Sequence, residues 1–413
     1  MNDSTKLSQL VLYRNLLADP LVYKLHLLLT SNAEPDLEYE LAAGLIEAAE
    51  RLGLDGNLWQ SYLIHCIASD ENTFTLAVEK SHGQIGQSIR EAAIHDIAIL
   101  LTILKAQPLP ACHNLVENFS PTKPTGTAAI TMLREFIFSS TPTVTPNELI
   151  DKLIEYYIHY GSGPTAGFKA FRWNDKTGLV GIVHPDAIKL DDIIGYESQK
   201  ATLVQNTEAF IAGRPANNIL LAGARGTGKS SSVKALINRY HTDGLRLVEV
   251  PKHQLSQLNI IIDRLRNRSQ KFIIFLDDLS FEEAESDYKY LKSIIDGGIE
   301  ARPANVLLYA TSNRRHLIRE SWADRADVQD IHSADTVQEK ISLADRFGIT
   351  LTFSAPNQDE FLQIVEGIAK RNDISLPAAE LKSAAIRWEM SRSGRSGRVA
   401  KQFVTHLLSN NKN

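Results

Sequence analysis

The sequence contains few cysteines and no long apolar run, and each shortage excludes a class of protein. Only two of its 413 residues are cysteine, Cys66 and Cys112, and no metal-ligand spacing surrounds either one. We therefore expect buried free thiols in a reducing cytosol rather than a disulfide framework. The apolar run at 97–104 is far shorter than the ~20 residues that a membrane-spanning helix requires. The chain is thus predicted to have no membrane segment.

The N-terminus and the overall charge exclude two further classes. Residues 1–10 lack the charged and then apolar pattern of a secretory signal, so we expect a cytoplasmic protein. The net charge of −5 argues against a molecule that binds nucleic acid over its whole surface. Hydrophobic residues make up 43% and charged residues 23%, which is ordinary for a globular chain long enough for two or three domains.

Apolar spacing divides the chain into two helical regions with a linker and an α/β region between them. Residues 1–160 carry apolar residues every three or four positions and predict an all-α domain, which we expect to bind a partner. A glycine-rich stretch begins a predicted linker at 161–178. From 179 to 355 strand-like and helical runs alternate, as in a parallel sheet flanked by helices. Strands then stop, and 356–413 predicts a small helical domain.

Five runs in the α/β region have the length and composition of buried strands. Ligands bind at the carboxyl ends of parallel strands, so polar side chains that follow these runs are candidates for a site. The expected strands are 219–222, 245–250, 272–276, 306–310 and 349–353.

A complete phosphate-binding loop follows the first of these runs. Its pattern is Gly223-x-x-Gly226-x-Gly228-Lys229-Ser230, and a helical stretch begins directly after it. The glycines allow successive backbone N–H groups to point at one anion, and the helix N-terminus adds a favourable dipole. Lys229 can reach the β- and γ-phosphates of ATP, and the Ser230 hydroxyl can ligate Mg²⁺. The alternative is a glycine-rich turn with a surface lysine. It is disfavoured because the pattern arises by chance in only about one or two such chains in a hundred.

Acidic side chains follow the buried run at 272–276. Asp277 is placed to hold Mg²⁺, usually through water, and Asp278 to activate an attacking water. Glu282 and Glu283 are nearby alternatives for the second role. A turn after a core strand would also explain two aspartates, but the upstream phosphate loop favours the catalytic interpretation.

Further candidate site residues lie before and after the phosphate loop in the sequence. Asn313 follows the fourth strand-like run and could orient water beside the γ-phosphate, although a strand-terminating turn is the alternative. Arg314 and Arg315 could serve oligomer contacts or phosphate charge, and the sequence does not decide between these roles. Ile194 and Gly195 form an apolar step that could line an adenine ring.

Two arginines and a basic segment complete the candidate set. Arg346 could reach the γ-phosphate of a neighbouring subunit, and Arg398 could reach the nucleotide in its own chain. Either could instead be a surface arginine. Residues 381–413 hold seven Lys or Arg and one Glu, which suits a lid over polyphosphate and also a contact with nucleic acid.

In this order and spacing, the motifs resemble an AAA+ ATPase module. The resemblance makes the Ile194 step box II, the phosphate loop Walker A and the acidic pair Walker B. It also makes Asn313 sensor 1, Arg346 the arginine finger and Arg398 sensor 2. It implies that the nucleotide contacts Ile194, Gly195, Gly223, Ala224, Arg225, Gly226, Thr227, Gly228, Lys229, Ser230, Ser231 and Arg398, that Ser230 and Asp277 hold Mg²⁺, and that Asp278, Asn313, Arg346 and Lys229 act in catalysis.

Four phrases resemble, more closely, a bacterial family of predicted ATP-binding proteins catalogued as a domain of unknown function. This resemblance covers roughly residues 160–410 and implies ATP binding, five core strands and a helical lid. The phrases are NNILLAGARGTGKSS at 217–231, DDLSFE at 277–282, ATSNRRHL at 310–317 and KISLADRFG at 340–348.

The leading functional hypothesis is Mg²⁺-dependent ATP hydrolysis at a site shared between subunits of a homo-oligomer. An unknown protein partner would bind residues 1–160 and be remodelled or loaded. Threading of a substrate through a central pore is disfavoured. Unfoldases that thread usually have an aromatic residue followed soon by glycine in a pore loop after the second core strand, and 250–258 has neither. In related ATPases a glutamate usually stands where this chain has Asp278, which is one methylene shorter. A slowly hydrolysing ATP-gated adaptor is therefore the second hypothesis. A small-molecule kinase is the third, and Asn313 and the helical lid argue against it.

Overall fold

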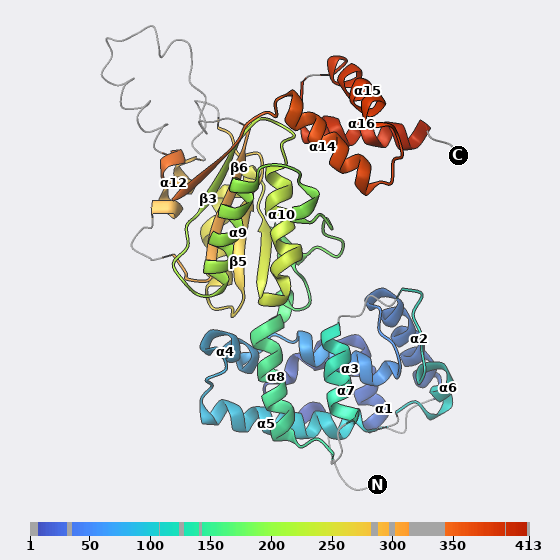
Figure 1. Cartoon of the computed structure of the whole chain (residues 1–413). Coiled ribbons are helices and arrows are strands. Elements are labelled where there is room, and N and C mark those ends of the chain that lie inside the picture. Colours follow the sequence, from blue (N-terminus) through green and yellow to red (C-terminus); the bar gives the residue numbers. More distant parts are fainter. Residues whose placement is uncertain are drawn as a thin grey trace. The chain divides into compact units, whose positions relative to one another are not determined.

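The computed structural model describes residues 7–30, 35–106, 108–123, 128–139, 143–281, 288–296, 302–313, 343–392 and 394–410. These residues form two compact units (Figure 1). Unit 1, called the helical unit below, comprises Met1–Phe168 together with Asn267–Gln270. Unit 2, the α/β unit, comprises Lys169–Arg266 and Lys271–Asn413. The helical unit is therefore discontinuous in sequence.

The helical unit is built around apolar helix faces, as the three- and four-residue spacing predicts. In α5, for example, Ile97, Leu100 and Leu104 are fully buried in one core. Helix α8 begins with a capping box, in which Thr145 and Glu148 bind each other's backbone N–H groups. The helices are α1 Pro20–Thr30, α2 Pro35–Leu52, α3 Leu58–Ser69, α4 Thr73–Ser81, α5 Gln87–Leu104, α6 His113–Val116, α7 Ala128–Ser139 and α8 Pro146–Tyr160. The prediction of an N-terminal helical region is confirmed.

The α/β unit contains a seven-stranded sheet with the order β2-β1-β4-β5-β6-β3-β7. All neighbouring strands are parallel except β1 and β2, which pair antiparallel. The five expected strands are present as β3 Ile219–Gly223, β4 Leu245–Glu249, β5 Lys271–Leu276, β6 Val306–Ser312 and β7 Ile349–Phe353. The phosphate loop follows β3, which lies between β6 and β7, so the loop emerges inside the sheet rather than at its edge.

Two strands extend the sheet beyond the five that the sequence predicts. They are β1 Ala170–Asn174 and β2 Gly178–Gly181, and β1 lies wholly in the range expected to be a linker. Phe171 and Trp173 alternate with exposed residues along β1 and are buried, which gives the strand its apolar face. The expected sheet was two strands too small because β1 pairs with β4, more than 70 residues further along the chain.

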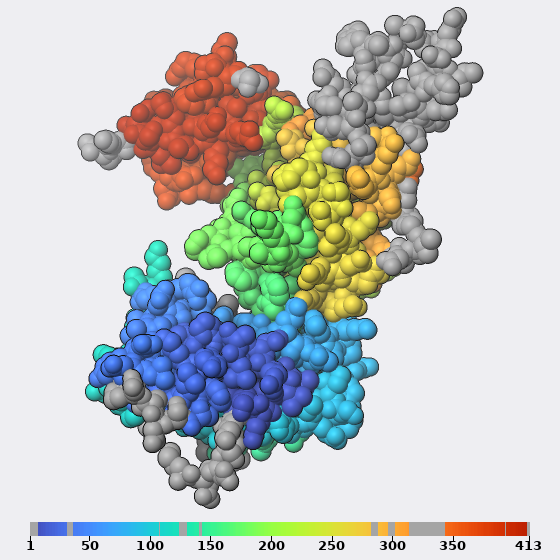
Figure 2. All heavy atoms as spheres, turned by 180° about the vertical axis from the view of Figure 1, so that it is seen from behind, coloured from blue at the N-terminus to red at the C-terminus, as the bar shows by residue number. Residues whose placement is uncertain are grey.

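Among the described residues, the α/β unit has helices that lie between its strands in sequence and three more that follow the last strand. The first four are α9 Glu197–Ile211, α10 Lys229–Tyr240, α11 Leu258–Arg266 and α12 Tyr288–Asp296. The last three are α14 Gln358–Arg371, α15 Ala378–Met390 and α16 Gly397–Asn410, which we call the lid. The lid has a small core of its own, with Phe361, Val365, Ala400 and Phe403 buried, and its residues are drawn in red in Figure 2. Asn357 and Glu360 form a capping box at the start of α14.

Candidate active site

The phosphate loop has a backbone shape that requires glycine. Gly223 has a φ of 138°, and a Cβ at this position would lie 2.1 Å from the carbonyl oxygen of Phe353 in β7. Gly226 has a φ of 74°, and a Cβ there would lie 2.9 Å from the Ser396 hydroxyl of the lid. L-residues rarely adopt these conformations, and the close neighbours leave no room for a side chain. The loop can therefore pass closely beside both the sheet and the lid.

Lys229 is held at the centre of the site by three oxygen atoms. Its Nζ donates to the carbonyls of Gly223 and Ala224 over 2.9 and 2.7 Å, and to Asn313 Oδ1 over 3.1 Å. Burial lowers the pKa of the Lys229 ammonium, and the carboxylates of Asp278 and Asp277 oppose that shift. These bonds use all three donors of the ammonium group.

Ser230 and Asp277 lie together at the carboxyl end of β5. The Ser230 hydroxyl donates to Asp277 Oδ1 over 2.6 Å. The Thr311 hydroxyl at the end of β6 also donates to Asp277 Oδ1 over 2.6 Å and accepts from the Asp278 N–H over 2.9 Å. Thr311 was not among the expected site residues. Its position is set by strand register, since Leu276 of β5 pairs with Ala310 of β6.

Asp278 has an unusual backbone conformation. Its φ is 52°, in the left-handed region that non-glycine residues seldom occupy. This conformation places its carboxylate where Asn313 Nδ2 donates to Oδ1. A chain of hydrogen bonds therefore runs from Lys229 through Asn313 to Asp278. Strained backbone of this kind often occurs at functional sites.

These side chains line a cavity of about 1040 Å³ between the sheet and the lid of the α/β unit. The volume is at the upper end of what small-molecule sites have. Most of the phosphate loop, the two aspartates and Asn313 form one part of the wall, and residues of the lid form another. The lining residues expected from the sequence are Ile194, Arg225, Gly226, Thr227, Gly228, Lys229, Ser230, Ser231, Asp277, Asp278, Asn313 and Arg398. Gly223, Ala224 and Gly195 do not line the cavity, and the first two contribute carbonyls to Lys229 instead.

The Ile194 step contributes to the lining of the cavity. Ile194 packs against α14 so closely that a Cβ on Gly367 would lie 2.3 Å from it. Tyr196, the next residue after Gly195, also lines the cavity and has a φ of 58°. Its ring lies 4.9 Å from that of Phe353, and its hydroxyl donates to the Ser354 carbonyl over 2.7 Å. These contacts tie the step to both β7 and the lid.

The two candidate arginines differ in their relation to the cavity. Arg398, in the first turn of α16, lines it, and its backbone N–H donates to the Gly226 carbonyl over 3.1 Å. Arg346 lies just before β7, is half-buried and is not among the lining residues. Of the remaining candidates, Arg314, Arg315, Glu282 and Glu283 lie outside the described residues.

Oxygen donors dominate the place where a cation would bind. Ser230 Oγ and Thr311 Oγ1 each lie 2.6 Å from Asp277 Oδ1. Hydroxyl and carboxylate oxygens are suitable ligands for Mg²⁺. Among the described residues there is no cluster of three or more His, Cys, Asp or Glu that could hold a metal ion by itself. The donor set therefore fits an ion that completes its coordination with ligands from outside the chain, such as phosphate oxygens and water.

The strand order and the phosphate loop between β3 and α10 define a P-loop NTPase fold of the AAA+ type with an all-α N-terminal region. Residues 166–411 match the family described as "Protein of unknown function (DUF815)", and the chain belongs to this family. The predicted resemblance to such a family, and its extent along the chain, are confirmed.

Solved structures of RuvB from Thermotoga maritima are similar to this chain. The structure titled as its Holliday junction branch migration motor has 19% sequence identity and a TM-score of 0.37, and a point variant has 18% and 0.37. Each match covers 54% of this chain and spans 64% of the length of RuvB. No curated protein sequence matches the chain significantly. Within the described ranges, no helix is both long and apolar enough to cross a membrane.

Proposed function

We propose that the protein binds ATP with Mg²⁺ in the cavity beneath the lid and hydrolyses it. The observation that carries this proposal is the hydrogen-bonded chain from Lys229 through Asn313 to Asp278, beside the Ser230–Asp277 pair. A lysine for phosphate charge, an oxygen set for a cation and a carboxylate for water lie within one cavity. This combination is what phosphoryl transfer requires.

The protein groups would act mainly by positioning and by charge. The N-terminus of α10 and the backbone N–H groups of the phosphate loop would bind the β- and γ-phosphates, with Lys229 between them. Ser230 would ligate Mg²⁺ directly and Asp277 through water, and the ion would neutralise charge that develops on the phosphate oxygens. Asp278 would accept the proton of the attacking water while Asn313 orients that water.

Two arginines would contact the nucleotide, one from its own chain and one from a neighbouring subunit. Arg398 lines the cavity of its own chain, which supports a contact with the nucleotide in cis. Arg346 lies outside this lining, which supports our proposal that it serves the site of a neighbouring subunit in a homo-oligomer. Residues 1–160 would then bind the protein partner that is remodelled or loaded. An ATP-dependent machine with these parts is the function we favour.

The test is nucleotide binding and turnover by the full chain. We expect ATP binding and Mg²⁺-dependent release of phosphate, with binding lost in Lys229→Ala and turnover lost in Asp278→Asn. In the second variant ATP should still bind, because Asp278 acts on water rather than on the phosphates. Retention of full turnover by either variant would contradict the assignment. A pull-down with Asp278→Asn in ATP would also identify a trapped partner.

A slowly hydrolysing ATP-gated adaptor is the second candidate, and one contact favours it. The Asp278 carboxylate already accepts a hydrogen bond from Asn313, and its side chain is one methylene shorter than the glutamate usual in related ATPases. Both features weaken its action as a base. Single-turnover measurements distinguish the candidates, since an adaptor would hold ATP uncleaved for hours.

A further inference from the structure

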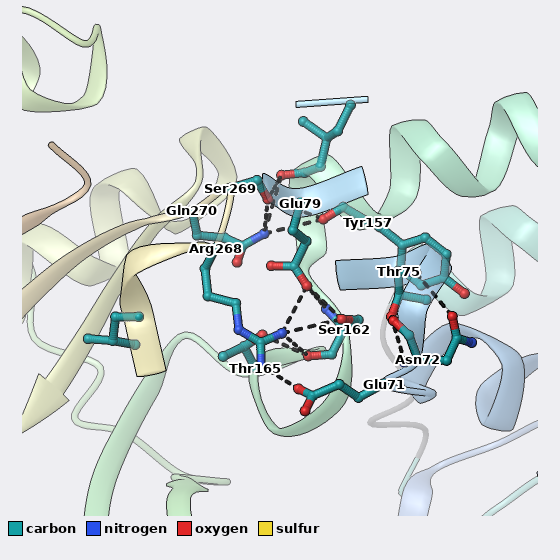
Figure 3. A network of polar contacts seen from close by, with 12 residues as sticks. Glu71, Asn72, Thr75, Glu79, Tyr157, Ser162, Thr165, Arg268, Ser269 and Gln270 are labelled. Atoms are coloured by element: carbon teal, nitrogen blue, oxygen red, sulfur yellow. Dashed lines mark hydrogen bonds and ion pairs between the residues drawn. The ribbon is translucent and has the colours of Figure 1, made fainter. Parts of the chain in front are cut away.

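A short segment from the middle of the α/β sequence belongs to the helical unit. The residues Asn267–Gln270 cluster with it, although the chain on both sides of them belongs to the α/β unit. They connect the end of α11 to the start of β5. Figure 3 shows the side chains of Arg268, Ser269 and Gln270 among the residues of the helical unit that bind them. We call these four residues the inserted segment.

Arg268 is the centre of this attachment. Its Nη1 donates to Glu79 Oε1 over 3.0 Å and to the Ser162 hydroxyl over 3.3 Å, and its Nη2 donates to Glu71. Glu79 accepts two more hydrogen bonds from Ser162, from its N–H over 3.0 Å and its hydroxyl over 2.6 Å. The Glu79 side chain is fully buried, and that of Arg268 is 9% exposed. A buried pair of this kind adds little net stability, but it penalises arrangements that separate its charges.

The next two residues bind the end of α8. The Ser269 hydroxyl donates to the Ile158 carbonyl over 2.7 Å, and Gln270 Nε2 donates to the carbonyls of Tyr157 and Ile158, each over 3.3 Å. The last carbonyls of a helix have no partner within the helix. The inserted segment supplies partners for the Ile158 carbonyl and a further donor for the Tyr157 carbonyl, which also accepts from the Gly161 N–H over 3.0 Å. It is therefore part of the folded structure of the helical unit.

Strand β5 leads directly from the inserted segment to the acidic pair. It begins at Lys271 and ends at Leu276, one residue before Asp277. Six residues of extended strand span about 20 Å. The strand is paired on one side with β4 and on the other with β6, and Phe272 to Leu276 are buried. A strand so tightly packed moves as a rigid element, because its neighbours leave no space for local bending.

We propose that Arg268 is a positioning residue, through which the helical unit sets the placement of Asp277 and Asp278 and thereby the rate of ATP cleavage. This inference rests on the proposed function, since it assigns regulation to the same acidic pair. This regulation requires two states of the protein. In one the inserted segment is bound to Glu79, and in the other it is released from Glu79. A partner that binds the helical unit and favours one state changes turnover. By reciprocity, ATP in the cavity changes how tightly the segment is held.

A pair of substitutions separates this role from a merely structural one. Arg268→Met alone leaves the Glu79 charge buried without its partner, so it destabilises the protein for reasons unrelated to catalysis. Adding Glu79→Gln removes the second charge of this pair and keeps the size of the glutamate side chain, while Met keeps the apolar stem of Arg268 without its charge. The control is Arg266→Met, two residues away, whose ion pair with Asp263 is at the surface.

The first measurement compares melting temperature, kcat and KM for ATP in the full-length protein. In the double variant we expect a melting temperature close to that of wild type, a KM within about twofold and a kcat changed by roughly 3- to 10-fold. The control variant should match wild type in all three. A folded double variant with unchanged kcat overturns the proposal.

A second measurement distinguishes failure of this inference from failure of the proposed function. Hydrogen exchange is followed in the peptides around Glu79 and Ser162, with and without ATP and Mg²⁺. We expect ATP to change exchange in wild type but not in the double variant. ATP that binds without any such change overturns the coupling alone. If ATP does not bind, both the proposed function and the coupling are wrong. If ATP binds and alters exchange but is not cleaved, hydrolysis is wrong and the coupling is supported.

Discussion

Lys229 donates a 3.1 Å hydrogen bond to the side-chain carbonyl of Asn313, and this bond uses the last of its three donors. An incoming phosphate needs the same protons, so binding must exchange at least one of these bonds for a phosphate oxygen. The bond to Asn313 is the longest of the three and the easiest to exchange. Nucleotide binding would then leave the Asn313 carbonyl available to a water molecule near Asp278.

This relationship predicts opposite effects of Asn313 on binding and on turnover. In Asn313→Ala the ammonium of Lys229 loses a competing acceptor, so ATP affinity should stay the same or increase by a few-fold. Turnover should fall by roughly 10- to 100-fold, because the group that orients water is gone. Titration with a fluorescent ATP analogue and a phosphate-release assay measure the two quantities. Weaker ATP binding with unchanged turnover would contradict the exchange.

Thr311 should matter for turnover although it carries no charge. Its hydroxyl donates to Asp277 and accepts from the Asp278 backbone, so Thr311→Val removes both bonds while keeping the shape of the side chain. We expect kcat to fall by roughly 10-fold or more and unfolding free energy by about 1–2 kcal/mol. Thr311→Ser keeps the hydroxyl and is the matched control. If both variants retain wild-type kcat, the hydroxyl does not position the acidic pair.

Gly223 should tolerate no side chain. Gly223 and Gly213 both have positive φ, but their surroundings differ. A Cβ on Gly223 would lie 2.1 Å from the Phe353 carbonyl oxygen, whereas a Cβ on Gly213 would meet no atom within 4 Å. Gly213→Ala therefore isolates the backbone strain, which costs about 1–2 kcal/mol. Gly223→Ala adds the clash and should cost about 3 kcal/mol or more, with loss of ATP binding. Urea unfolding of both variants measures the difference, and equal losses would show that the clash is relieved.

The pH dependence of ATP binding should reveal the environment of Lys229. Its pKa is lowered by burial, so the ammonium is lost at a lower pH than in free lysine. ATP affinity should therefore decline as pH rises through this lowered pKa, before the ordinary lysine range is reached. The nucleotide-free protein should behave oppositely and gain stability over the same interval, because the unfolded chain binds the proton more tightly. Calorimetric titrations between about pH 7 and about pH 10 test both signs.

Mixing two inactive variants tests whether Arg346 acts on a neighbouring subunit. Arg346→Ala should bind ATP but not cleave it, and Lys229→Ala should neither bind nor cleave it. In a mixed oligomer, the intact cavity of the first variant can meet the intact arginine of the second. We expect turnover to recover to roughly a quarter of wild type in an equal mixture, as random pairing of neighbours predicts. If mixed oligomers form but ATP turnover does not recover measurably, Arg346 does not act on a neighbouring subunit.

How far the sequence predicts the structure depends on the sequence distance over which each contact forms. The phosphate loop, its flanking strand and helix, and the polar residues after β5 and β6 follow from patterns within about twenty residues, so they were predictable. Thr311 was missed because its role depends on the pairing of β5 with β6. Strands β1 and β2 were missed because β1 gains its partner from β4. The Arg268–Glu79 contact joins positions 189 residues apart, and no local pattern indicates it.

The discontinuity of the helical unit also sets an order for its synthesis. A ribosome completes Met1–Phe168 long before it reaches Asn267–Gln270, the residues that supply partners for Glu79 and for the end of α8. Until then, Glu79 has no arginine partner. These contacts can form only after β3 and β4 have been synthesised, so completion of the first unit waits for the synthesis of part of the second.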